Sequence, residues 1–165
     1  MFETINPRET IAVTTRAETN LMGKTETRDN ILILDWHMPA SINPPMYAIA
    51  VRNDHHTIEM LRKSGAFVIN VIPFEMKEQI IFCGQVSGRH VDKFKHAKLL
   101  KEEAESIEGV RIKDCLSYLE CRVEQEIPLG DHVIFIGQVL LTYHNKAGKK
   151  LYHLRGDKFT TTIEQ

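Results

Sequence analysis

The chain has 165 residues, of which 42% are hydrophobic and 26% charged, a composition typical of a soluble globular protein that excludes global disorder. Its 21 basic and 22 acidic residues leave a net charge of −1, so no surplus of charge points to a nucleic acid or an anionic membrane. Apolar runs fall well short of the ~20 residues of a membrane span, and the first residues show no secretory signal pattern.

Strands are predicted through the first half of the chain by apolar, β-branched runs at residues 11–15, 30–36, 46–51 and 67–72. The polar stretch at residues 17–29 is expected to be an exposed hairpin or loop. Prolines at 39, 44 and 45 predict an irregular extended segment, because proline has no N–H to donate to a strand ladder.

Short helices are predicted in the middle of the chain, at residues 54–64, 75–82 and 91–98, from apolar positions spaced three apart. Asp54 or Thr57 is a candidate cap for the first helix, and Gly65 a candidate stop. Alternating residues at 119–127 predict a half-buried strand with Glu120 on its polar side. A turn at 129–132, a strand at 133–143 with a bulge at Gly137, and a last strand at 151–154 complete the pattern.

This pattern favours an antiparallel barrel with helical excursions over a doubly wound α/β sheet, because strands dominate both ends without alternating with long helices. We expect one domain over residues 1–165. Rossmann, P-loop, nucleophile-elbow and zinc motifs are absent from the sequence. Three cysteines, Cys83, Cys115 and Cys121, show no paired spacing, so we expect them to pack in the core of a cytoplasmic protein.

Three segments place polar residues within apolar structure. Residues 35–41 follow a buried strand, and turn chemistry is the simpler interpretation of this segment alone. Asn70 lies inside an apolar strand, so its amide needs partners, from a neighbouring loop or from the polar edge of a heterocycle. Residues 83–94 combine glycines, a hydroxyl and cations, which suits either a phosphate site or an exposed turn.

Taken in order, these motifs resemble the flavin reductase-like, FMN-binding split-barrel family over residues 6–160. The matching segments are residues 6–8, 13–15, 36–39 with 44–45, 67–70, 83–94, 119–121, 130–137 and 151–153. The polar insert at residues 21–27 is longer than the family pattern, but it affects no flavin position. The resemblance implies a mainly β, FMN-binding split β-barrel of antiparallel Greek-key type, and a homodimer with FMN near the subunit interface.

The resemblance also assigns site residues. Those implied to bind FMN are Leu34, Asp35, Trp36, His37, Ser41, Asn70, Cys83, Ser87, Gly88, Arg89 and Lys93. Within this set, Ser87, Gly88, Arg89 and Lys93 would hold the phosphate, and the others the ring and ribityl chain. His153 is implied to approach the ring or the hydride donor, as a catalytic residue. A flat, largely apolar ring with a charged tail suits such a mixture.

The implied activity is hydride transfer from NADH or NADPH to FMN, for flavin or ferric reduction. The alternative is an FMN-carrying, flavoredoxin-like protein that receives electrons from a redox partner protein. A haem or other flavin held through His37 or His153 is a third, less favoured interpretation. NADPH would need a cation near its 2′-phosphate, and the candidates are Arg52, Arg62, Lys149 and Arg155.

Overall fold

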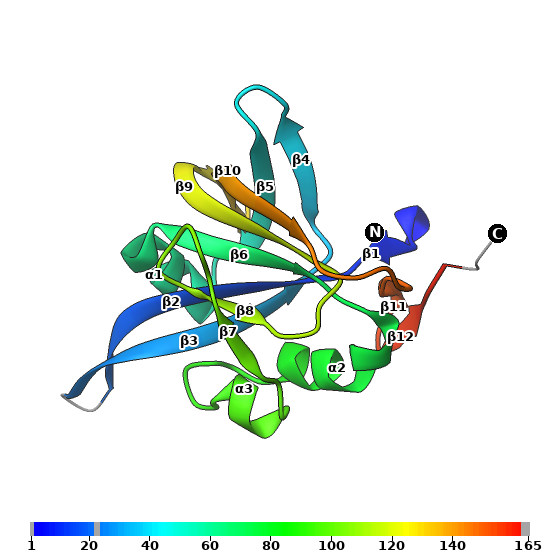
Figure 1. Ribbon diagram of the computed structural model, residues 1–165, viewed down its shortest axis with the longest axis horizontal. Helices are drawn as coiled ribbons and strands as arrows, with labels where there is room; N and C mark the ends of the chain where they lie inside the picture. The colour runs from blue at the N-terminus through cyan, green and yellow to red at the C-terminus, as the bar shows by residue number, and fades with distance from the viewer. Residues whose placement is uncertain (1, 22–23, 163–165) are drawn as a thin grey trace.

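Antiparallel strands form most of the computed structural model, which describes residues 2–21 and 24–162 (Figure 1). The strands are β1 (Arg8–Glu9), β2 (Ile11–Leu21), β3 (Lys24–Leu34), β4 (His37–Ser41), β5 (Met46–Arg52), β6 (Ala66–Val71), β7 (Lys101–Glu103), β8 (Val110–Ile112), β9 (Ser117–Leu129), β10 (His132–His144), β11 (Tyr152–Arg155) and β12 (Lys158–Thr160). The α-helices are α1 (His56–Ser64), α2 (Lys77–Gln85) and α3 (Lys93–His96), and the 3-10 helices are η1 (Phe2–Ile5) and η2 (Phe74–Met76).

Among the described residues, one seven-stranded sheet has the order β3-β2-β6-β9-β10-β5-β4, beside smaller sheets of β1-β11-β12 and β7-β8. Every strand pair is antiparallel. The predicted mainly β, antiparallel fold with short helices is therefore confirmed. Two hairpins project from the body, β4–β5 at the top and β2–β3 at the lower left of Figure 1.

Strand β6 is buried on both faces, with all six of its residues inaccessible to solvent. Val68 packs into a core under α2, α3 and β8, whereas Phe67 and Ile69 face a second core that holds α1, β5 and β10. Burial on both faces explains why this strand reads as a continuous apolar run. None of the helices in the described ranges is long and apolar enough to span a membrane.

Helix α1 confirms its predicted stop but not its predicted cap. Gly65 has φ 63°, and its N–H donates to the Leu61 carbonyl at 2.9 Å. The residue at the N-cap is His55, and no side chain caps the first turn, so the prediction of Asp54 or Thr57 as the cap is wrong. The helix predicted at 91–98 is shorter than expected, because Asp92 caps it by accepting from the Lys95 N–H at 3.1 Å.

The proline segment also differs from its prediction. Pro39 lies within β4, which pairs with β5 at the edge of the sheet, and the register shifts between Pro39 and Ser41. An edge strand tolerates proline because only one of its sides is paired. The bulge predicted at Gly137 is confirmed, and an added Cβ there would lie 2.8 Å from the Phe67 ring.

Glu120 is fully buried, so its predicted place on a polar, solvent-facing side is wrong. Its carboxylate accepts from Arg111 Nε at 2.8 Å and from the N–H groups of Glu105 and Ser106 at 2.9 and 2.6 Å. Burial alone would raise the pKa of Glu120, but these hydrogen bonds outweigh it and hold the pKa below its usual value. The Arg111–Glu120 pair joins β8 to β9, and the N–H groups of Glu105 and Ser106 tie the loop after β7 to the same carboxylate.

Candidate functional site

The end of β3 borders three neighbouring hollows that share lining residues, and together we call them the β3 groove. The α1 hollow, about 240 Å³, lies between β3, the start of α1 and the loop after α2. The Trp36 hollow, about 290 Å³, lies between β3, β5 and the β9–β10 turn. The His153 hollow, about 230 Å³, lies between β3, α2 and the β11–β12 hairpin. Ile33 borders all three, so they meet along this strand.

Most of the residues predicted to form the site border this groove. They are Leu34, Asp35, Trp36, Cys83, Ser87, Gly88, Lys93 and His153. They come from the end of β3 and the residues after it, from α2 and the loop that follows it, from the start of α3, and from β11. The fold therefore brings together segments that are more than a hundred residues apart in the sequence.

Asn70 does not belong to this group. Its side chain is completely buried, and its Nδ2 donates to the Ala12 carbonyl and Thr14 hydroxyl, both at 3.1 Å. Its Oδ1 accepts from the Ile112 N–H at 2.8 Å. The amide is satisfied by the strands β2 and β8 rather than by a neighbouring loop, so a flavin contact at Asn70 is not supported.

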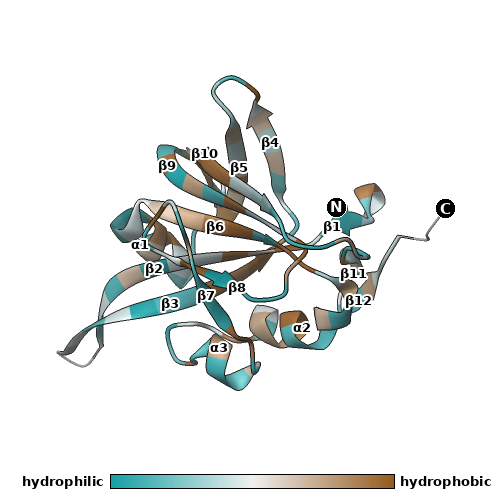
Figure 2. Ribbon diagram, viewed as in Figure 1, coloured by the Kyte–Doolittle hydropathy of each residue, from teal (hydrophilic) through white to brown (hydrophobic). Residues whose placement is uncertain are grey.

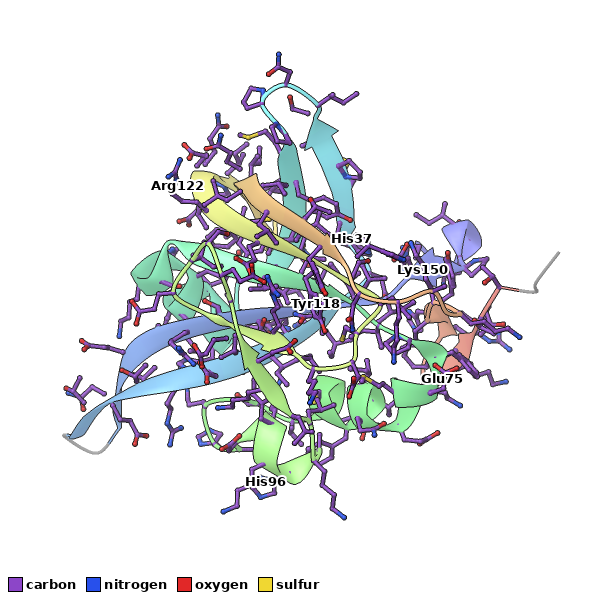
Figure 3. All side chains as sticks on the ribbon, in the orientation of Figure 1. His37, Glu75, His96, Tyr118, Arg122 and Lys150 are labelled. Atoms are coloured by element: carbon purple, nitrogen blue, oxygen red, sulfur yellow. The ribbon has the colours of Figure 1, made fainter. Side chains whose placement is uncertain are left out.

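Three more predicted residues lie outside the groove. His37 lies at the base of the β4–β5 hairpin (Figure 3), where Tyr47 Oη is 2.7 Å from Nδ1 and the Glu9 carbonyl 3.0 Å from Nε2. Ser41 is exposed near the tip of the same hairpin. Arg89 is half exposed and pairs with Glu59 of α1 at 3.4 Å.

Lys93 is a buried ammonium group at the base of the α1 hollow. Its Nζ donates to the Ile31 and Cys83 carbonyls, both at 2.7 Å, and one N–H remains. Within the described residues, no carboxylate forms an ion pair with it. Burial lowers the pKa of Lys93 to about 8. Such a site favours an anion that would compensate the buried charge.

The first turn of α1 faces the same hollow, through His55, His56 and Thr57. The N–H groups of His55 and Ile58 already donate to backbone carbonyls at 3.1 Å. Because no side chain caps this helix, those of His56 and Thr57 are available to an anion, and the helix dipole adds to the attraction. Sequence reasoning missed these residues, since it treated the segment only as the start of a helix. The available signal was the run of polar residues at 53–57, where the helix begins.

Asn30 lies in β3 against Gly88 of the segment at residues 83–94, which we call the glycine loop. Its Nδ2 donates to the Thr57 hydroxyl at 3.0 Å, and its Oδ1 is buried with no hydrogen-bond partner. A Cβ on Gly88 would lie 1.9 Å from this oxygen, so only glycine permits the loop to pack here. Asn30 was not predicted, because its place at the polar start of an apolar run gave no distinguishing pattern.

His153 and Asp35 form a pair at the other end of the groove. His153 Nδ1 is 2.6 Å from Asp35 Oδ2, and Nε2 is 2.9 Å from the Gly156 carbonyl. Each ring nitrogen therefore has an oxygen within hydrogen-bond distance, which fixes the orientation of the ring. Thr10 donates to the second oxygen of Asp35 at 2.7 Å, which fixes the carboxylate.

The Trp36 hollow has an aromatic wall. The rings of Trp36 and His132 stack with centroids 4.6 Å apart, and Trp36 is 37% exposed. Burial is the main cause that lowers the pKa of His55, which also borders this hollow. With the apolar side chains of Leu32, Leu34 and Val51, this wall suits a flat ring.

Two further findings concern the cysteines and the polar insert. All three cysteines are buried and free, which confirms their predicted packing role, and burial raises the pKa of Cys83 to about 11. A separate hollow of about 570 Å³ lies between the β2–β3 ribbon and the end of α1, and it shares no lining residue with the groove. Residues 22–23 of the insert lie outside the described residues. No cluster of metal-ligating side chains occurs in the described ranges.

Several known proteins are similar to this chain in sequence or in structure. The chain is 28% identical to the NADH-dependent FMN reductase AsuE2 of Streptomyces nodosus subsp. asukaensis, over 70% of this chain and 62% of the relative. The crystal structure of the FMN-binding protein from Thermus thermophilus matches 100% of this chain and 91% of its own with a TM-score of 0.86 at 20% identity. Flavoredoxin from Methanosarcina acetivorans matches 98% and 88% with a TM-score of 0.81 at 25% identity.

The match of a whole-domain profile settles the classification. The family described as "Flavin reductase like domain" matches residues 6–162, nearly the whole chain. The predicted split-barrel architecture and the predicted family are therefore confirmed, and the chain belongs to the flavin reductase-like domain family.

Proposed function

We propose that this protein binds FMN in the β3 groove and reduces it with NADH or NADPH. The observation that carries the proposal is Lys93, a buried cation without a carboxylate partner among the described residues, beside an uncapped helix terminus. A phosphate monoester supplies the missing negative charge, and charge-assisted hydrogen bonds make such contacts strong.

In this arrangement the α1 hollow takes the phosphate. Lys93 would donate its remaining N–H, and the N–H groups of His56 and Thr57 and the Ser87 hydroxyl would add donors. Asn30 offers an unsatisfied oxygen to a hydroxyl of the ligand. The neighbouring NADH-dependent FMN reductase and FMN-binding protein support FMN as the ligand.

The end of β3 and the Trp36 hollow would hold the flavin ring, against apolar side chains and the Trp36–His132 pair. FMN held there would supply hydride-accepting chemistry, with NAD(P)H as the donor of the two electrons. The His153 hollow, on the other side of Asp35, is left for the nicotinamide. His153 holds its proton at Nδ1 against Asp35 and shapes this space.

A second candidate function is an electron carrier that is reduced by a redox partner protein rather than by NAD(P)H. The likeness to flavoredoxin favours it. Both functions use the same FMN residues, so the difference lies in whether NAD(P)H reaches the ring.

We further propose that the protein forms a homodimer through the outer face of β4, β5, β10 and β9. Met38, Ala48 and Ile136 lie in one row across these strands, and Ala50, Ile134 and Ile127 in the next. Met38 is 60% exposed and Ile127 40% exposed, and the hydrophobic β10 crosses this face (Figure 2). Gln125 of β9 lies opposite Ile136 and interrupts the first row, but a largely apolar face of this kind typically covers an interface. Three free, buried thiols also suit the cytoplasm we propose as its location.

The test is a visible absorption spectrum of the purified protein, with chromatography of any ligand released by heat. A flavin spectrum with FMN released supports the proposed cofactor. Steady-state oxidation of NADH and NADPH with added FMN then separates reductase from carrier, because a carrier oxidises neither at an appreciable rate. A colourless protein that also fails to bind added FMN would refute the proposal.

A further inference from the structure

We propose that the β11–β12 hairpin binds the adenosine half of the hydride donor, and that Arg155 and Lys158 select a donor that carries a 2′-phosphate. The protein would thus prefer NADPH to NADH. This inference rests on the proposed function, since it assigns a subsite to the second substrate of the same groove.

The charge pairing of the arginines singles out this hairpin. In the described residues, every other arginine makes an ion pair or another polar contact, whereas Arg155 makes none. Of the other candidate cations, Arg52 is held by Asp54 at 2.7 Å and Arg62 by Glu126. Lys149 also has a partner. Arg155 is the candidate that remains available to a ligand.

Its position is beside the proposed nicotinamide space. His153, Gly156, Asp157 and Phe159 all border the His153 hollow, and Arg155 is an exposed residue between the first two of them. Lys158 is its cross-strand partner, which brings two cations to the same end of the hairpin. Asp157 is the carboxylate of the same turn, so these three residues keep a net positive charge.

The volume of the His153 hollow indicates which part of the donor the hairpin contacts. About 230 Å³ is smaller than the roughly 300–1,000 Å³ of a typical ligand pocket, so a whole dinucleotide does not fit inside. With the nicotinamide inside, the adenosine half has to lie over the rim. An arginine there offers a planar fork of donors that matches a phosphate, whereas the hydroxyl of NADH offers it no charge.

The test uses the FMN-loaded full-length protein and two fragments of the donor, 2′,5′-ADP and 5′-AMP, with affinities measured by calorimetry. We expect wild type to bind 2′,5′-ADP more tightly. Arg155→Gln should weaken 2′,5′-ADP by about 10- to 150-fold, the range of charge-assisted hydrogen bonds, and leave 5′-AMP unchanged. Arg155→Lys, which keeps the charge without the fork, should lose less. Arg122→Gln, at an exposed arginine of β9, is the matched control and should change neither.

Equal affinity of wild type for the two fragments would overturn this proposal, as would an equal loss of both in Arg155→Gln. In kinetics we expect kcat/KM for NADPH to fall in Arg155→Gln while that for NADH stays constant. If the protein binds FMN but oxidises NADH and NADPH equally well, this inference alone is overturned. Failure to bind FMN overturns the proposed function as well, so the two failures are distinguishable.

Discussion

Replacing Lys93 with methionine isolates the contribution of the buried ammonium to FMN binding. Methionine has a similar length and no charge, so the variant removes the N–H that we assign to the phosphate. A hydrogen bond to a charged group contributes about 1.5–3 kcal/mol, which predicts an FMN dissociation constant about 10- to 150-fold higher. Riboflavin has no phosphate, and its affinity should not change.

The same change has a structural cost that must be measured separately. Lys93→Met leaves the carbonyls of Ile31 and Cys83 without this donor, at about 1–3 kcal/mol each, although it also removes the cost of burying an ammonium group. Thermal unfolding measures this balance. Lys95→Met, at an exposed lysine two residues further on α3, is the control and should bind FMN as wild type does.

Calorimetric titration of both variants with FMN and riboflavin decides the question. The reasoning predicts loss of the preference for FMN over riboflavin in Lys93→Met alone. If Lys93→Met weakens both ligands equally, Lys93 is a structural residue and the phosphate lies elsewhere. An unchanged FMN affinity in a folded variant would refute the assignment outright.

Four other results are expected. First, burial lowers the pKa of Lys93 to about 8, so FMN affinity should fall as pH rises above 8 and Lys93 loses its charge. The FMN phosphate is already fully ionised at this pH, and riboflavin affinity should not fall. Lys93 releases its proton earlier in the folded chain than in the unfolded one, so its contribution to stability rises from pH 8 to about 10.5, which chemical denaturation across that range checks. Second, Glu120→Gln removes the buried counter-charge of Arg111 and leaves it only the exposed Glu105, so it should cost about 3–5 kcal/mol in urea unfolding, against little for exposed Glu124→Gln. Third, Gly137→Ala should destabilise by about 1–3 kcal/mol because its Cβ meets the Phe67 ring, whereas Gly84→Ala, with 3.9 Å to its nearest contact, should be tolerated. Fourth, Asn70→Leu should lower the melting temperature without changing FMN affinity in the folded protein; a selective loss of FMN would return Asn70 to the site.

The strands could be predicted from the sequence because buried positions favour apolar residues. Strand β6 is apolar throughout since both of its faces are buried, and Gly65 marks the end of α1 since only glycine adopts its backbone angle readily. The glycine loop at 83–94 and the residues that end β3 were also identified from local chemistry. Such features depend on each residue and its neighbours along the chain.

The tertiary structure decided which polar residues meet. Asn70 and Glu120 carry polar groups that the sequence could not place, and the fold buries both against partners from β8 and the segments beside it. Pro39 pairs as an edge strand because β4 happens to be the last strand of the sheet. The first turn of α1 reaches the glycine loop, and His153 reaches Asp35, only because the chain returns to β3 from far along the sequence. A hydrogen bond between distant residues leaves no periodic pattern in either segment, so residue pattern predicts the elements while their contacts determine the site.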